Sequence, residues 1–139
     1  MLNYISKGES VFNWFKKRPG SGPDFSHVDS REKAEELYKR GQLEKVCLMP
    51  LEFGGADFPP NIVYLPPGIS EIKAGIDKNV IAPLAANGTI RHYSATPEYE
   101  GRSFIPIAIN VKASDPGNFS TTINVWGSAL HRNTLSNNV

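Results

Sequence analysis

Few residues in this chain could carry out acid–base chemistry, and they are widely separated in the sequence. Glu52 and Asp57 lie on either side of a glycine pair and could act as paired carboxylates, with His92 as a further acid or base. Carboxylates in loops are more commonly solvated or bonded to turn amides. A small hydrolase or transferase that uses Glu52, Asp57 or His92 is therefore an alternative hypothesis and not the leading one.

Nucleophilic and metal chemistry find even less support in the residue pattern. Cys47 lies in an apolar stretch without a motif that would lower its pKa, so we interpret it as a small structural side chain. The three histidines, His27, His92 and His131, follow no metal-ligand spacing. Gly54-Gly55 is not followed by a helix N-terminus, as a phosphate-binding loop would require. We predict no catalytic residue, no metal and no cofactor.

The most distinctive segment is rich in residues that restrict or redirect the backbone. Residues 48–68 contain five prolines and three glycines around two short apolar runs. Proline fixes φ, and glycine opens conformations closed to other residues, so this pattern predicts a rigid, shaped loop between two strands. Rigid loops on a packed scaffold often carry binding sites. The predicted partner-binding residues are Glu52, Phe53, Asp57 and Phe58.

Composition excludes several classes of function. The 15 Lys and Arg against 14 Asp and Glu give a net charge of +1, which argues against a nucleic-acid binder because phosphate contacts require a basic excess. The single cysteine excludes an internal disulfide and is typical of a reducing compartment, so we expect a cytoplasmic protein. No apolar run is long enough to span a membrane, and the N-terminus lacks a secretory signal. We expect one domain over residues 1–139.

The N-terminal third predicts two short helices. Residues 1–17 are rich in aromatic side chains and precede the basic run Lys16-Lys17-Arg18, so they predict a helix that packs on the core or a partner. A peripheral membrane or scaffold role for this segment is a further alternative, although so short a helix would not anchor stably. A connector follows to residue 28. Asp29 and Glu32 then predict a capping box for a helix that ends near Arg40, with Gly41 as its left-handed cap.

The remainder predicts one more helix and a set of strands. Apolar residues recur at three- and four-residue intervals from Ile69 to Leu84, which indicates a central helix with one buried stripe, kinked or ended at Pro83 and closed by Asn87-Gly88. The stripe is Ile69, Ile72, Ile76, Val80 and Leu84. Strands are expected over residues 43–49, 61–65, 89–96, 102–113 and 119–126, with a hairpin loop at 114–118 and an edge or bulge at Pro106. Residues 127–139 are polar and are expected to fray.

Together these elements predict an α+β fold. It would have a mostly antiparallel sheet of about five strands, with the central helix packed on one face and two shorter helices at the N-terminus. Ile72, Ile76 and Val80 would face the strands of residues 89–126, where Ile105, Ile107, Ile109 and Val111 offer a matching apolar surface.

Three segments resemble small bacterial proteins that are encoded beside polymorphic or contact-dependent toxins as immunity proteins. They are Met49-Pro50-Leu51-Glu52-Phe53-Gly54-Gly55, the strand of residues 61–65, and the hairpin of residues 103–126. The resemblance implies a cytoplasmic α+β protein that binds and neutralises a toxin domain without catalysis. Immunity proteins against nucleases are often acidic, whereas this chain is nearly neutral, so the expected partner is not a strongly basic nuclease.

Overall fold

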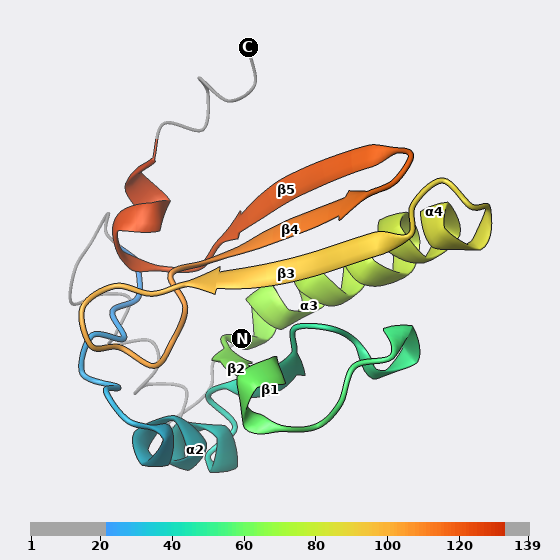
Figure 1. Ribbon diagram of the computed structural model, residues 1–139. Helices are drawn as coiled ribbons and strands as arrows, with labels where there is room; N and C mark the ends of the chain where they lie inside the picture. Colours follow the sequence, from blue (N-terminus) through green and yellow to red (C-terminus); the bar gives the residue numbers. More distant parts are fainter. Residues whose placement is uncertain (1–21, 133–139) are drawn as a thin grey trace.

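The computed structural model describes residues 22–132. The helix predicted within residues 1–17, and the membrane alternative that depends on it, lie outside the described residues. The described part is α+β, as the sequence predicts, and all of its strand pairs are antiparallel. The strands form two sheets of two and three strands, in place of the single sheet of about five that was expected (Figure 1).

The first described helix, α2 (Arg31–Lys39), ends as predicted but begins with a different cap. Ser30 is the N-cap, and its hydroxyl accepts a hydrogen bond from the Lys33 amide at 3.1 Å. The prediction of Asp29 as the cap is wrong, because its carboxylate forms an exposed ion pair with Lys33 at 2.9 Å. At the other end Gly41 adopts the predicted left-handed conformation, with φ of +79°.

Two short strands enclose the segment rich in proline and glycine. Strand β1 (Glu44–Cys47) pairs with β2 (Ile62–Leu65), in a register that places Glu44 opposite Leu65 and Cys47 opposite Ile62. The segment between them contains two 3-10 turns, Leu51–Phe53 and Pro59–Asn61. The sequence left the pairing of these strands open, and the structure pairs them antiparallel.

The central helix is continuous but changes its winding midway. It consists of α3 (Pro67–Ile76), a π-helical turn (Asp77–Ile81) and α4 (Ala82–Ala86). Pro83 does not end it, and this residue lies in the first turn of α4, directly after the π-helical turn. The irregularity instead precedes the proline, where the Ala82 amide bonds to the Asp77 carbonyl five residues earlier. Gly88, with φ of +79°, closes the helix as predicted.

The larger sheet is an antiparallel meander of three strands, in the order β3-β4-β5. These are β3 (His92–Glu98), β4 (Ala108–Ser114) and β5 (Asn118–Asn124). The predicted hairpin loop between β4 and β5 is confirmed. Strand β4 begins six residues later than residue 102, so Pro106 precedes the strand and occupies neither an edge nor a bulge within it.

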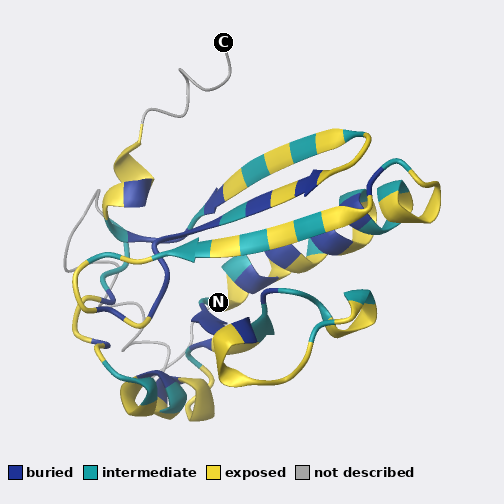
Figure 2. Cartoon of the chain, in the orientation of Figure 1, coloured by how far each residue is buried: buried dark blue, intermediate teal, exposed yellow. Residues whose placement is uncertain are grey.

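The core is one cluster of buried residues from the larger sheet, the small sheet, α2 and the central helix, and the helix contacts both β5 and β1. Ile105, Ile107, Ile109 and Val111 are all buried, as expected, but Ile105 and Ile107 precede β4, and Pro106 and Ala108 are buried as well, so alternation of burial holds only within the strand (Figure 2). The predicted stripe on the helix is only partly correct, because Ile72 is 50% exposed and Ile76 and Val80 are half-buried. The buried face of the helix instead carries Ser70, Lys73, Asp77 and Ile81.

The stretch expected to fray begins with ordered structure. Gly127–His131 forms a 3-10 helix in which Ala129 is fully buried. Just before it, the Trp126 indole donates a hydrogen bond to the Ile105 carbonyl at 2.9 Å and packs edge-on against Phe25. The prediction that the chain frays from residue 127 is therefore wrong for residues 127–131, and residues 133–139 lie outside the described part.

Candidate functional site

A groove of about 700 Å³ runs between the small sheet, the first 3-10 turn and the central helix. Its walls carry chemically varied side chains, among them Glu44 and Cys47 from β1 and Ser70, Lys73 and Asp77 from the helix. The Ser70 hydroxyl donates to the Glu44 carboxylate, so this polar pair already satisfies itself across the groove. Cys47 is a half-buried free thiol. Residues 50–53 of the proline-rich loop form part of its wall.

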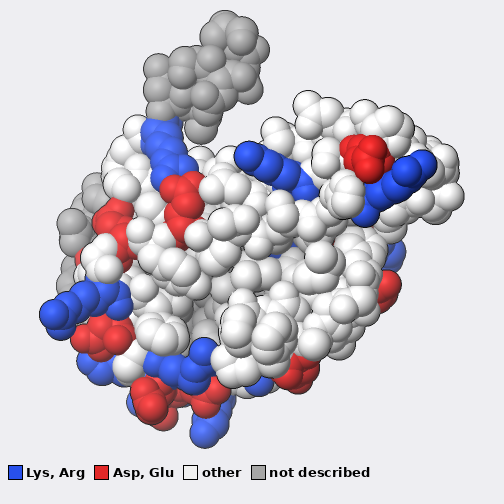
Figure 3. Space-filling model, viewed as in Figure 1, with Lys and Arg blue, Asp and Glu red and all other residues white. Residues whose placement is uncertain are grey.

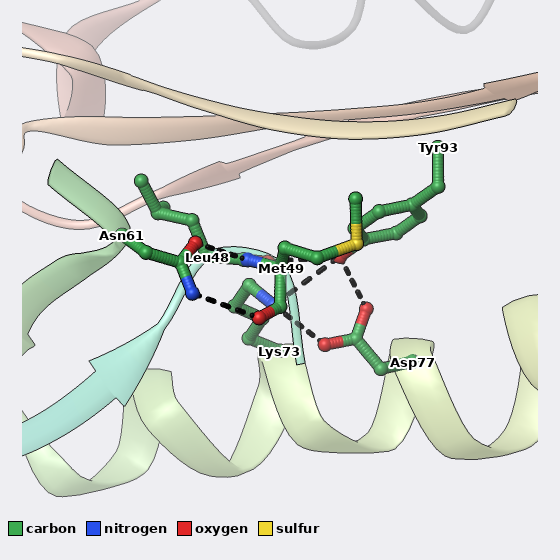
Figure 4. A network of polar contacts seen from close by, with 6 residues as sticks. All are labelled: Leu48, Met49, Asn61, Lys73, Asp77 and Tyr93. Carbon is green, nitrogen blue, oxygen red and sulfur yellow. Dashed lines mark hydrogen bonds and ion pairs between the residues drawn. The ribbon is translucent and has the colours of Figure 1, made fainter. Parts of the chain in front are cut away.

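Asn61 holds the loop of residues 48–61 in a fixed shape. Its side-chain oxygen accepts a hydrogen bond from the Met49 amide at 2.8 Å, and its side-chain nitrogen donates to the Met49 carbonyl at 3.0 Å (Figure 4). The same nitrogen donates to the Ala56 carbonyl at 2.9 Å. An asparagine can do this because it carries both a donor and an acceptor group. Asn61 is 8% exposed, so water does not replace these bonds readily.

The two glycines of this loop are required by its geometry. Gly54 has φ of +98°, a conformation that other residues rarely adopt. A Cβ atom at Gly55 would lie 1.9 Å from the Met49 carbonyl oxygen, which leaves no room for any side chain. The Gly55 amide also donates to the Pro50 carbonyl at 3.0 Å. Glycine and asparagine thus fix the loop through its backbone.

Beneath this loop lies a polar network that the sequence did not reveal. The Lys73 ammonium, on a residue only 1% exposed, lies 2.5 Å from an oxygen of Asp77 and donates to the Tyr93 hydroxyl at 3.2 Å. The Tyr93 hydroxyl in turn donates to the other oxygen of Asp77 at 2.6 Å. A buried cation needs such partners, since leaving it unpaired would be very costly.

The network joins three layers of the molecule. Lys73 and Asp77 come from the central helix and Tyr93 from β3, and the Tyr93 hydroxyl lies 3.4 Å from the Leu48 carbonyl oxygen at the start of the loop (Figure 4). Burial, and then the bond to Asp77, raise the pKa of Tyr93 well above its ordinary value. Tyr93 therefore stays protonated at neutral pH and acts as a structural donor.

The four predicted partner-binding residues do not all face solvent. Glu52 and Asp57 are exposed, and Phe58 is 50% exposed. Phe53 is half-buried, and its ring packs edge-on against Tyr93 with 5.5 Å between the ring centroids. Sequence reasoning missed Leu51, which is 58% exposed beside them. We call Leu51, Glu52, Asp57 and Phe58 the loop surface.

The residues proposed for hydrolysis come together only in part. Glu52 and His92 line a smaller depression of about 360 Å³, together with Arg91, but Asp57 does not line it. His92 is strongly exposed and lies 3.3 Å from Asp115, a residue of the β4–β5 hairpin. Cys47 lines the groove and not this depression, so no thiol–imidazole pair forms. These positions do not assemble a nucleophile with its base.

The sequence contains no motif that marks the four polar residues Lys73, Asp77, Tyr93 and Asn61. Lys73 and Asp77 are four residues apart, a spacing that normally indicates an exposed ion pair on a helix. Tyr93 and Asn61 are single polar residues in short strands or turns, without a motif. Lys73 lies one helical turn after Ile69, and Asp77 directly follows Ile76. This position within an apolar stripe is the one feature of the sequence that could have indicated that both charged residues are buried.

Comparisons with known proteins add no assignment: no protein-family model, no curated protein and no solved structure matches this chain. Within residues 22–132, His, Cys, Asp and Glu nowhere gather in the groups of three or more that could hold a metal ion. In the same range every helix is too short or too polar to cross a membrane. On the face shown in Figure 3, acidic and basic side chains are intermixed and do not form one patch.

Proposed function

We propose that this chain is a non-enzymatic protein-binding module whose partner is a toxin domain that it neutralises. The observation that carries the binding role is the loop surface itself. Two large apolar side chains, Leu51 and Phe58, are 58% and 50% exposed on a loop that Asn61 and two glycines hold rigid. A fixed loop with exposed apolar side chains is favourable for binding and unnecessary for stability.

Rigidity supports this role for an energetic reason. A partner that binds a preformed loop does not lose affinity to the ordering of that loop. Aromatic and large apolar side chains are also the usual anchors of protein interfaces. Glu52 and Asp57 flank the anchors, so the complementary surface of the partner carries basic groups or backbone amide donors. The toxin-neutralising part of the proposal is supported by the resemblance of residues 49–55, 61–65 and 103–126 to immunity proteins.

The test uses the toxin domain encoded in the adjacent reading frame. The full chain is co-expressed with this domain, and growth of the host and the Kd of the purified pair are measured. Leu51→Asp and Phe58→Asp should abolish protection and weaken binding at least about tenfold each, as expected for interface anchors. Tyr99→Asp, at a residue that is 49% exposed outside the loop surface, is the matched control and should bind normally.

Two results would contradict the proposal. The first is a toxin domain that neither binds the chain nor loses activity in its presence. The second is equal loss of protection by Tyr99→Asp and Phe58→Asp, which would indicate a general effect on folding. Circular dichroism of each variant separates that effect from the loss of a contact.

A further inference from the structure

The larger sheet has an outer edge without a strand partner among residues 22–132. β5 pairs with β4 on one side only, in the register that places Val111 opposite Thr121. The other edge of the sheet is β3, which contains Pro97, a residue that natural proteins use to block pairing at an edge. β5 reads Asn-Phe-Ser-Thr-Thr-Ile-Asn, with no charge, proline or glycine. This edge therefore lacks the usual protection against pairing with another chain.

The sequence of β5 is complementary to itself when it is reversed. An antiparallel pair centred on Thr121 places Asn118 opposite Asn124, Phe119 opposite Ile123, and Ser120 opposite Thr122. Each pair joins residues of similar polarity, and each residue meets a partner on the same face of the sheet because alternation is preserved. A two-fold axis through Thr121 would thus match both faces at once. Such self-complementarity is what a symmetric dimer interface requires.

A polar ladder on the outer face points to the same partner. The Thr122 hydroxyl donates to the Asn110 side-chain oxygen at 2.7 Å, the Asn110 side-chain nitrogen donates to the Glu98 carboxylate at 2.7 Å, and this ladder stops at the edge. In the proposed pair, Ser120 of the second copy would lie next in the ladder.

From these observations we propose that the chain forms a homodimer through its β5 strands, which pair antiparallel about Thr121. The two three-stranded sheets then form one continuous sheet of six strands. β5 lies on the far side of β3 and β4 from the 48–61 loop in Figure 1, so the loop surface stays open in the dimer. The proposal is independent of the function proposed above, and each can fail without the other.

The first experiment measures the mass of the full chain in solution. Charged side chains are then introduced on both sides of the two-fold axis, first with like and then with opposite charges facing each other. Light scattering after size exclusion, from micromolar to several hundred micromolar protein, should show a concentration-dependent dimer. Ser120→Glu with Thr122→Glu places like charges opposite each other twice, and should weaken the dimer about tenfold. Ser120→Glu with Thr122→Lys makes the same two pairs attractive and should restore the dimer. Within one chain Ser120 lies opposite Lys112, so a glutamate there is tolerated.

A crosslink gives a second readout that does not depend on affinity. Ser120→Cys and Thr122→Cys are prepared separately in a Cys47→Ser background and are mixed under oxidising conditions. Opposite positions are close enough for a disulfide, so in an equal mixture the mixed dimer should exceed either homodimer by much more than the twofold excess that random pairing gives. A monomer at every concentration, a dimer equally stable with both charge pairs, or crosslinking without preference for the mixed product would each overturn the proposal. A monomer that pairs only with another protein would also overturn it.

Discussion

At the scale of single residues, the candidate site depends on a few polar side chains that are fully committed to structure. Lys73, Asp77 and Tyr93 bond to one another, and Asn61 bonds only to the backbone. Each of the four therefore has structural partners inside the chain, and removing one of them leaves a buried polar group without a partner.

Asn61→Ala should destabilise the protein by about 2–4 kcal/mol, because the Met49 amide and the Met49 and Ala56 carbonyls would lose their partner together. Urea denaturation monitored by tryptophan fluorescence measures this change. Asn79→Ala, at an exposed helix position, is the control and should change stability little. A similar midpoint for both variants would show that Asn61 does not hold the loop.

Tyr93→Phe should destabilise the protein at neutral pH, because Lys73 loses a hydrogen-bond acceptor and Asp77 loses a donor when the hydroxyl is removed. The pKa of Tyr93 is raised on folding from about 10 in the unfolded chain, so the folded state retains a proton that the unfolded state releases above that pH. The contribution of Tyr93 is therefore complete below pH 10 and declines above it. The stability difference between the wild type and Tyr93→Phe should narrow in that range. A constant difference in denaturation series across pH 8–11 would contradict this assignment.

At the scale of elements, the sequence predicts most of the local structure correctly, but not how the elements are arranged in space. Helix α2, the β4–β5 hairpin and the left-handed conformations of Gly41 and Gly88 all follow from short-range chemistry. The division into two sheets does not, because alternation shows that a strand has an inner face but not which strand lies beside it. The buried face of the central helix was misplaced for a similar reason. The buried face is offset by one residue from the predicted stripe already in α3, before the π-helical turn, and there Lys73 pairs with Asp77 in the interior.

The corrected helix face gives a direct test in place of the predicted Ile72 contact. Ile81 is 1% exposed, so Ile81→Ala should destabilise the protein by about 2–5 kcal/mol. Ile72 is 50% exposed, and Ile72→Ala should change stability by less than about 0.5 kcal/mol. Both variants make the same Ile-to-Ala change within the helix, so the difference between their free energies of unfolding reports the difference in burial. A larger effect at Ile72 than at Ile81 would support the apolar stripe predicted from the sequence.

The position of the α2 cap can be tested in the same way. Ser30→Ala removes the side-chain acceptor for the Lys33 amide and should destabilise the protein by about 1 kcal/mol. Asp29→Ala removes only an exposed ion pair and should leave the thermal midpoint nearly unchanged. An equal or larger effect at Asp29 would favour the capping box that the sequence indicated.

At the scale of the whole molecule, charge and shape are informative mainly by contrast with other classes of protein. The net charge of +1 gives the chain no overall basic excess, and on the face shown in Figure 3 the acidic and basic side chains are intermixed. The class of the fold was predictable from composition and pattern. The sequence predicts only the segment of the chain that carries the proposed binding surface. It does not show which side chains of that segment are exposed, as Leu51 and Phe58 are, and which are half-buried, as Phe53 is.

The nearly neutral net charge gives a prediction for the full chain. In an electrophoretic mobility assay at physiological salt, neither duplex DNA nor single-stranded RNA should shift at micromolar protein, because few counterions would be released on contact. A shift that disappears steeply with added salt would contradict the prediction and would indicate a cationic surface contributed by the full chain.

Asn61 recognises only peptide groups, at Met49 and Ala56, and no side chain of the loop that it holds. The shape of the loop is consequently separable from the identity of the residues that it displays. Leu51, Glu52, Asp57 and Phe58 can be exchanged for other side chains while the same peptide bonds keep their positions. Under the function proposed above, a lineage that carries this scaffold would change its partner by substitution at four exposed positions, and a laboratory library restricted to those positions would sample new specificities on an unchanged fold.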